Sequence, residues 1–324
     1  GLNPLETRRI ALLDATVRRY RLRPGTTVAE AVRQLRVRGG IVTGAQPNYL
    51  FELQDDKGGT ASASVQYAVT TLKLDEAHRI AEGRNVVVAV IDSGIDDTNP
   101  EISGSVAERF DALDAPFAPD PHGTAMAGAI AAHGVLIGAA PAARILAIRA
   151  FAGSGGNAAT GTSFDILEGL DFAAAHGAQI VNMSFAGPRD SLLGRALKTA
   201  RDKGIVEIAA AGNGGPDAAP LYPAAEPSVI AITATDAEGS MYAQANRGPY
   251  VDAAAPGVGV LASAPGGALQ MSSGTSIAAA EASGIAALVI ESRRGATPED
   301  ILDILQRTAH RLGEGKTGKV GLID

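Results

Sequence analysis

The stretch "VVVAVIDSGID", residues 86–96, decides the fold of this chain. Its first six residues are apolar without interruption, and such a run is typical of a parallel strand covered by helices on both faces. Asp92 follows at once, where the chain leaves the predicted strand. A carboxylate in that place is partly desolvated and needs a partner, although an aspartate so close to Gly94 could also be an ordinary turn residue.

Predicted strands and helices alternate through the rest of the chain. This alternation predicts the α/β class, with a mostly parallel central sheet between helices. In such sheets ligands bind at the carboxyl ends of the strands and at the N-termini of the helices that follow. The further strand-like segments are 144–150, 178–185, 205–212 and 228–235, and the helix-like segments are 124–132, 163–177, 191–204, 276–290 and 297–309.

Composition limits the classes of protein that remain. The 324 residues are 46% hydrophobic and 19% charged, which is typical of a globular chain. Cysteine is absent, which excludes disulfides, thiol catalysis and cysteine metal sites. No apolar run approaches the roughly 18 residues of a membrane span, and no charged-then-apolar leader opens the chain. We therefore expect no membrane span and no signal segment in it.

The net charge of −7 is unevenly distributed. Residues 1–40 contain nine arginines and three acids, a net +6, and the remaining residues carry −13. A small basic piece joined to a large acidic one suggests that the two attract each other. The alternative is a basic arm for nucleic acid, but only 4% of the residues are aromatic, so stacking platforms are scarce. We expect no nucleic-acid partner.

The N-terminal region has the pattern of a small separate unit. Residues 8–54 predict two strands, a helix and a last strand in "NYLFEL". These are few elements for a domain that is stable alone. The polar, small-residue stretch "QDDKGGTASAS", residues 54–64, is the best domain boundary in the chain.

One histidine and one serine stand at predicted helix starts. His122 opens "HGTAMAG", where small residues leave room for another element to approach, and a buried helix N-terminus favours a neutral imidazole. Ser276 lies in "SSGTSIAAAEASG", residues 272–284, where it could be a simple N-cap. A serine hydroxyl becomes a nucleophile beside a base that a third group orients. Asp92, His122 and Ser276 can supply acid, base and nucleophile at one sheet edge.

These segments carry a family resemblance. "VIDSGID", "HGTAMAG" and "SSGTSIAAAEASG", in that order, resemble the three catalytic blocks of the subtilisin-like serine proteases. "IVNMSFAG" is similar to the substrate-binding strand of that family and "IAAAGNGG" to its oxyanion-hole block, so the likeness runs from about Ala63 to the C-terminus. The resemblance implies a three-layer α/β sandwich and a serine endopeptidase.

The resemblance also implies a role for each site residue. Ser276 would attack the scissile carbonyl, His122 would move its proton and Asp92 would orient the imidazole. Asn213 would donate its side-chain amide to the oxyanion, beside the backbone N–H of Ser276. A peptide substrate would add as a strand between two edges near 152–156 and 184–187. The substrate-binding residues implied are Gly153, Ser154, Gly155, Ser184, Phe185, Ala186, Gly187, Ala210, Ala211 and Gly212.

The basic N-terminal unit resembles the later part of the family's inhibitory propeptide. We therefore predict a partial propeptide at 1–54, a linker or processing region at 55–66 and a catalytic domain at 67–324. Residues 51–64 would occupy the cleft as a product-like strand, with cleavage near 54–64. The partners implied are peptide or protein substrates and the propeptide itself, and the localisation implied is extracellular or periplasmic.

The chain departs from the family pattern at several positions. Ala280 and Glu281 stand where the serine helix usually has a proline, Ile277 stands where a methionine is common, and Ala186 replaces a glycine, which would narrow the first substrate pocket. Relatives often bind calcium in a loop inserted after the histidine helix, but "AAHGVLIGAAP" continues without that polar insertion. We expect no cofactor, and the sequence does not support calcium.

Two other functions fit parts of the sequence. A catalytically silent relative that binds peptides or proteins would keep the fold, and the altered serine helix leaves room for it. A nucleotide-binding domain would suit the glycine-rich "GGNAATG", but the G-x-G-x-x-G turn between a strand and a helix is missing. Labelling of Ser276 by a fluorophosphonate separates the first alternative from an active protease.

Overall fold

The computed structural model describes residues 2–37, 42–54, 66–153, 159–312 and 320–324. Its centre is a nine-stranded sheet in the order β15-β16-β12-β11-β10-β8-β4-β6-β5. Every neighbouring pair in this sheet is parallel except β15 and β16. The strands are β4 (Val87–Asp92), β5 (Val106–Asp111), β6 (Arg144–Arg149), β8 (Ile180–Met183), β10 (Val206–Ala210), β11 (Ile230–Thr235), β12 (Ala253–Pro256), β15 (His310–Arg311) and β16 (Gly321–Leu322).

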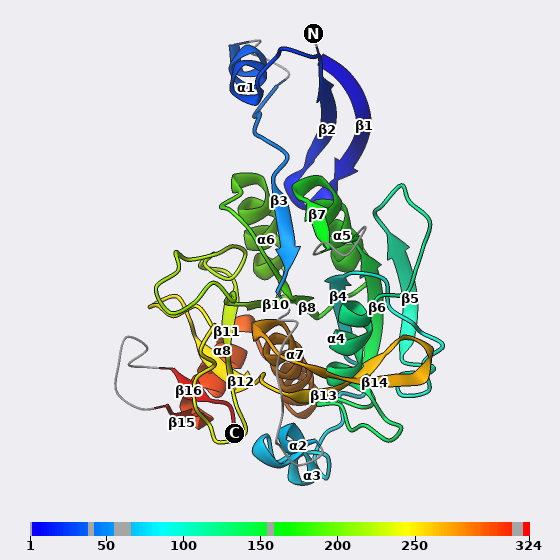
Figure 1. The fold of residues 1–324 in the computed structure, drawn as a ribbon, viewed down its shortest axis with the longest axis vertical. Helices are drawn as coiled ribbons and strands as arrows, with labels where there is room; N and C mark the ends of the chain where they lie inside the picture. Colours follow the sequence, from blue (N-terminus) through cyan, green and yellow to red (C-terminus); the bar gives the residue numbers. More distant parts are fainter. Residues whose placement is uncertain (1, 38–41, 55–65, 154–158, 313–319) are drawn as a thin grey trace.

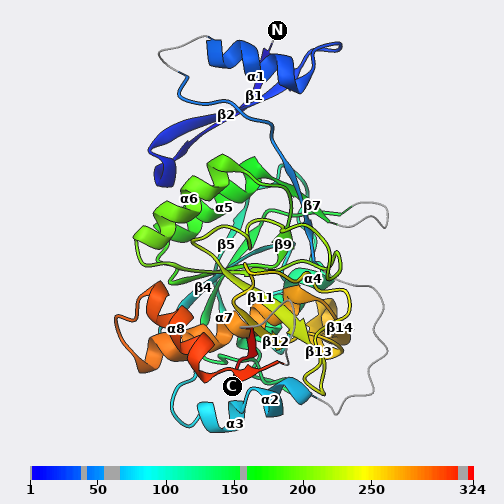
Figure 2. The same cartoon turned by 90° about the vertical axis from the view of Figure 1, so that its left-hand side faces the viewer.

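Helices cover both faces of the sheet, as Figures 1 and 2 show. One core cluster contains residues of α4 and α7, together with residues of α8 and of the short α2 and α3. The cluster on the opposite face contains residues of α5 and α6. The predicted three-layer α/β architecture is thereby confirmed. The helices are α2 (Tyr67–Thr71), α3 (Leu74–Ala77), α4 (Pro121–Ala131), α5 (Ser163–Ala175), α6 (Ser191–Asp202), α7 (Thr275–Ser292) and α8 (Pro298–Thr308).

Strand β4 is the strand predicted from the apolar run at 86–91. Both of its faces are buried, which explains why its residues are apolar without interruption. Val88 and Val90 belong to the cluster beneath α4 and α7, whereas Ala89 and Ile91 belong to the cluster beneath α5 and α6. Successive side chains of a strand point to opposite faces, so a strand covered on both sides must be apolar throughout. Asp92 ends the strand at the carboxyl edge of the sheet.

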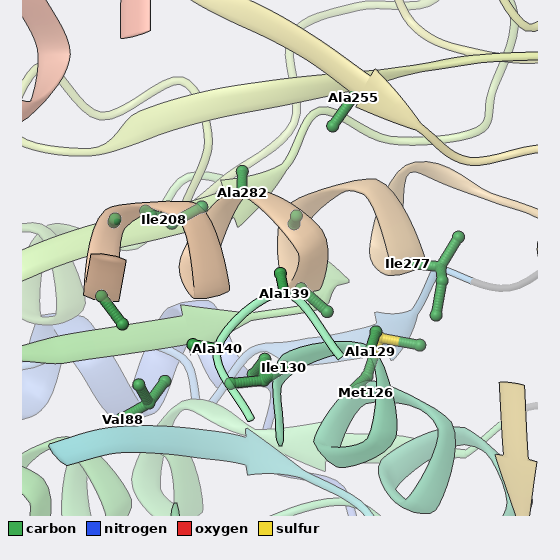
Figure 3. Packing of buried hydrophobic residues seen from close by; sticks show 14 of the residues in the cluster. Val88, Met126, Ala129, Ile130, Ala139, Ala140, Ile208, Ala255, Ile277 and Ala282 are labelled. Carbon is green, nitrogen blue, oxygen red and sulfur yellow. The ribbon is translucent and has the colours of Figure 1, made fainter. Parts of the chain in front are cut away.

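Helix α7 runs through the core, and most of its side chains in the core cluster are alanines, such as Ala282 in Figure 3. A Cβ added at Gly284 would lie 2.4 Å from the Cβ of Ala139, so the neighbouring backbone approaches the helix closely. Among the described residues, α7 is the one helix long and apolar enough to cross a membrane by length and composition. It is a core helix here, because 72% of that window is buried inside the protein.

The N-terminal unit has the predicted order of β1 (Leu2–Ile10), β2 (Ala15–Leu22), α1 (Val28–Val37) and β3 (Leu50–Leu53), with a short 3-10 turn, η1 (Ala11–Leu13), after β1. Strands β1 and β2 form their own antiparallel pair. Strand β3 leaves that unit and pairs with β7 (Thr160–Thr162) and β9 (Phe185–Ala186). Figure 1 shows β3 descending from the unit into the body of the molecule.

Acidic residues of α5 meet the basic N-terminal unit. Arg8 pairs with Glu168, and Arg19 lies 3.4 Å from Asp165. Burial raises the pKa of the Glu168 carboxyl, and the bond from Arg8 opposes that shift. The basic N-terminal unit and the acidic remainder of the chain are therefore joined by ion pairs between arginines of the unit and acids of α5.

A hairpin completes the fold beside α4. Strands β13 (Val260–Ala264) and β14 (Ala268–Ser272) pair antiparallel, joined by the turn η2 (Pro265–Gly267). The hydroxyl of Ser263 donates to the carbonyl oxygen of Thr124 in α4 at 2.9 Å. This contact holds the hairpin against the helix that carries His122.

Candidate active site

Asp92 and His122 meet at the carboxyl edge of the sheet. Asp92 is fully buried at the end of β4, and its Oδ1 lies 2.6 Å from Nδ1 of His122. The same oxygen accepts the backbone N–H of Ser93 at 2.7 Å. Because a carboxylate only accepts hydrogen bonds, the imidazole carries a proton on Nδ1. This leaves Nε2 as the ring nitrogen that can accept a proton.

The start of α4 fixes the backbone of His122. Asp120 is the N-cap, and its Oδ1 accepts the N–H of His122 at 2.9 Å. Pro121 follows at the first helical position, where its missing N–H costs nothing. A Cβ at Gly123 would lie 2.7 Å from the carbonyl oxygen of Ser93, so a larger residue would separate α4 from β4. The small residues after His122 therefore allow the close approach expected from the sequence.

Ser276 is the second residue of α7 and not its cap. The N-cap is Gly274 at φ +150°, so the simple capping explanation for Ser276 is wrong. The serine is fully buried, and its Oγ makes no hydrogen bond among the described residues. The structure therefore forms the Asp92–His122 contact of the predicted triad, while Ser276 Oγ is not bonded to the imidazole.

Three groups converge beside Gly274. A methyl group built on this glycine would lie 2.6 Å from the carbonyl oxygen of Gln54, 2.9 Å from Nδ2 of Asn213 and 3.2 Å from Oγ of Ser276. The amide of Asn213 donates to that carbonyl oxygen at 2.9 Å. A peptide carbonyl, a side-chain amide and a serine hydroxyl thus surround one small volume, which only glycine leaves open.

Thr275 sets the orientation of the Asn213 amide. Oδ1 of Asn213 accepts both the backbone N–H and the hydroxyl of Thr275, each at 3.0 Å. The oxygen of the amide is therefore directed toward α7, and the nitrogen is directed toward Gln54. Gly212 precedes Asn213 at φ +111°, a conformation that favours glycine, and its N–H donates to the Thr275 hydroxyl at 3.1 Å.

The end of the N-terminal unit lies in the cleft as an added strand. Strand β3 runs antiparallel to β7, with Phe51 opposite Gly161, and antiparallel to β9, with Leu53 opposite Phe185. The N–H of Gln54 then donates to the carbonyl oxygen of Ser184 at 3.1 Å. Backbone pairing on both sides carries residues 50–54 to the point where Ser276 and Asn213 converge.

The first predicted binding edge, at 152–156, lies only partly within the described residues. The edge expected at 152–156 does not pair with β3 within the described residues: Gly153 is exposed, and Ser154 and Gly155 lie outside the part of the chain described. Ala152 instead exchanges backbone hydrogen bonds with Thr160 at 3.1 Å. Strand β7, which contains Thr160, is the edge that pairs with β3.

The other predicted edge, at 184–187, is in place. Phe51 of β3 is fully buried, with its ring edge-on to Phe185 at a centroid distance of 5.9 Å. Phe151 packs behind Phe185 at 4.8 Å. A Cβ at Gly187 would lie 2.5 Å from the Phe51 ring, so glycine makes the space that this ring fills. Ala186 pairs with Glu52, and Ala210 and Ala211 are buried at the end of β10.

Sequence reasoning missed several residues of the site. Ser93, Asp120 and Thr275 hold the groups described above, and each has a local signal. Asp120 precedes a proline at a helix start, which is a capping pattern, and Thr275 directly precedes Ser276. The position of Gln54 had a weaker signal, because it depends on strand pairing with distant segments.

Side chains from two other segments bind the loop after α4. Gln66 donates from Nε2 to the carbonyl oxygen of Val135 at 3.0 Å and accepts the N–H of Ile137 at 2.7 Å. Oε2 of Glu101 accepts the N–H of Leu136 at 2.7 Å. These side chains bind backbone polar groups of the loop. Across the described ranges, no group of three histidine or acidic residues could hold a metal ion.

The sheet, its two helical layers and the site at its carboxyl edge are those of a subtilisin-like serine protease. A family model described as "Subtilase family" matches residues 83–321, and the chain belongs to this family. The thermophilic serine proteinase of Bacillus sp. (strain AK1) is 33% identical over 305 residues, covering 91% of this chain and 74% of the relative. Subtilisin E of Bacillus subtilis (strain 168) is 34% identical over 296 residues, covering 86% and 74%.

A solved structure agrees with these sequence relatives. The crystal structure of a cold adapted subtilisin-like serine proteinase superposes with a TM-score of 0.67 at 29% identity, covering 74% of this chain and 89% of the other. The predicted family and fold are confirmed, and the chain is a serine endopeptidase.

Proposed function

We propose that this enzyme cleaves peptide bonds through Asp92, His122 and Ser276, by way of an acyl-enzyme. The observation that carries the proposal is the convergence of the Gln54 carbonyl oxygen, Asn213 Nδ2 and Ser276 Oγ beside Gly274. A carbonyl held between an amide donor and a hydroxyl is the geometry from which acyl transfer begins.

The proposed reaction follows from these positions. Ser276 Oγ attacks the carbonyl carbon and gives its proton to Nε2 of His122, while Asp92 holds Nδ1 and stabilises the imidazolium. The developing oxyanion accepts hydrogen bonds from Asn213 Nδ2 and from the backbone N–H of Ser276. The imidazolium then protonates the departing amine, and a water molecule repeats the sequence on the acyl-enzyme to release the acid.

The proposed autoprocessing site is the bond between Gln54 and Asp55. Gln54 has the two contacts expected of the residue before a scissile bond: its N–H bonds to Ser184 and its carbonyl oxygen bonds to Asn213. Residues 50–54 would then remain in the cleft as a product strand and inhibit the enzyme. This narrows the expected cleavage from the region 54–64 to one bond, and it makes residues 1–54 the partial propeptide.

The proposed substrate preference is an aromatic residue four positions before the cleaved bond. Phe51 holds that position when Gln54 precedes the bond, and its buried ring contacts Phe185 above the space left by Gly187. Backbone pairing with β7 and β9 accepts other side chains more generally. Peptide and protein substrates are therefore expected, at an extracellular or periplasmic location as the family resemblance implies.

The experiment labels the protein with a fluorophosphonate and measures its intact mass. We expect wild type to gain one adduct on Ser276 and to yield a fragment ending at Gln54, whereas Ser276→Ala gains no adduct and stays intact. A folded wild type that takes no label and remains uncleaved would contradict the proposal and favour the silent peptide-binding alternative.

A further inference from the structure

A second carboxylate lies beside the Asp92–His122 pair. The hydroxyl of Ser93 is 2.9 Å from Oδ1 of Asp120 and 3.2 Å from Oδ1 of Asp92. It also accepts the N–H of Gly123 at 3.0 Å. Because one hydroxyl has one proton to donate, Ser93 bridges two acids and donates to one of them at a time.

Asp120 is tied to both members of the pair. Its Oδ1 accepts the backbone N–H of His122 at 2.9 Å, and through Ser93 it reaches the carboxylate that holds the ring. We propose that Asp120 is a positioning acid for His122: it fixes the ring against Asp92, and its charge favours the imidazolium that forms when Ser276 is deprotonated. This inference rests on the proposed function of the triad.

The other charges around His122 do not cancel that of Asp120. A cavity of about 280 Å³ is lined by Ser93, Asp111 and Arg149 among others. The Arg149 guanidinium is bound by Asp111 at 2.7 Å and by two backbone carbonyl oxygens. On α7 the acid nearest in sequence to Ser276 is Glu281, which interacts electrostatically with Tyr67. Among the described residues no ion pair involves Asp120.

The electrostatic consequence has a definite sign. A negative charge close to an imidazole favours its protonated form, and a half-buried position weakens screening by salt. The partial positive charge at the N-terminus of α4 also interacts favourably with an acid at position 120. Removing the charge should therefore make His122 lose its proton at lower pH and should weaken the stabilisation of the imidazolium.

The test compares two variants of Asp120. Asp120→Asn keeps a good N-cap but loses the charge, and Asp120→Ala loses both. For Asp120→Asn we expect the acidic limb of the kcat/KM profile to move to lower pH by several tenths of a unit, with a several-fold fall in kcat at the plateau and little change in KM. Asp120→Ala should show the same shift of the limb and a further fall in kcat, because the backbone of His122 is released.

Two controls make the result decisive. Thr297→Ala removes the cap of α8, whose side chain accepts the N–H of Asp300 at 3.2 Å; it should lower Tm and leave the pH profile in place. Wild type is first titrated with a fluorophosphonate to show that Ser276 reacts. If wild type takes no label, the proposed triad is refuted, and this result is separate from a failure of the proposal for Asp120. If wild type is labelled and the profile of Asp120→Asn coincides with it, the proposal for Asp120 is wrong.

Discussion

Glu281 gives the sharpest test of the energetics of α7. This carboxyl lies five residues after Ser276, fully buried, and its Oε2 has no hydrogen-bond partner among the described residues. Burial raises the pKa of Glu281 from 4.5 to about 8, because the ionised form would lose its hydration. The folded enzyme therefore keeps this acid neutral at pH 7, whereas the unfolded chain ionises it.

The sign and size of the effect follow from proton linkage. Between pH 4.5 and pH 8 the folded state binds more protons at Glu281 than the unfolded state does, so stability falls as the pH rises through this window. Within this window the unfolding free energy falls by about 1.4 kcal/mol for each pH unit. From pH 4.5 to pH 7 the loss amounts to roughly 3 kcal/mol. Glu281→Gln keeps the shape and removes the ionisation, so we expect similar stability to the parent at pH 4.5 and roughly 3 kcal/mol more at pH 7.

Urea unfolding at pH 5, 6, 7 and 8 measures the difference. Both proteins should carry Ser276→Ala, so that self-cleavage does not distort the transitions. The gap in unfolding free energy between Glu281→Gln and its parent should widen steadily with pH and level off above about pH 8. A gap that stays constant across this range would refute the reasoning, because Glu281 would then ionise alike in both states.

Four further outcomes are expected. Asn213→Ala should lower kcat by about 10²–10³ with little change in KM, measured on one fluorogenic peptide; an unchanged kcat would remove this amide from the reaction. Peptides with phenylalanine rather than alanine four residues before the bond should gain about 2 kcal/mol, roughly thirtyfold in kcat/KM, and Gly187→Val should abolish that preference while sparing the alanine peptide. Activity should survive dilute hydrogen peroxide, since Ile277 offers no thioether beside Ser276; rapid inactivation would contradict this. A chelator should leave Tm unchanged, and a sharp fall would show that calcium binds after all.

The positions of Asp92, His122 and Ser276 could be predicted because local pattern determines them. The apolar run before Asp92 and the small residues after His122 and Ser276 each describe a packing environment that the fold then supplies. Two features depended instead on contacts between distant segments. Ala152 bridges to Thr160 of β7, and β7 is the edge that pairs with β3 on the side away from β9.

The local sequence pattern gave a wrong N-cap at the start of α7, the helix that carries Ser276. Ser276 is a residue type that favours the N-cap, but the N-cap of α7 is Gly274, two residues earlier, at a φ of +150°. The burial of Glu281 could not be predicted from the sequence either, because a charged residue is usually exposed. Both differences lie in α7, the helix that carries Ser276.

The alanine wall behind Ser276 determines how this enzyme keeps its shape over time. Most of the buried α7 residues in the core cluster are alanines, which have no side-chain torsion to change, and the larger ones are Ile277 and Leu288. The placement of the Ser276 hydroxyl therefore depends mainly on the helix backbone and on the χ1 torsion of the serine itself, and little side-chain disorder can develop around it before the helix unfolds. We would expect such an enzyme to hold full turnover up to the temperature at which the whole domain melts, and then to lose it in a single step.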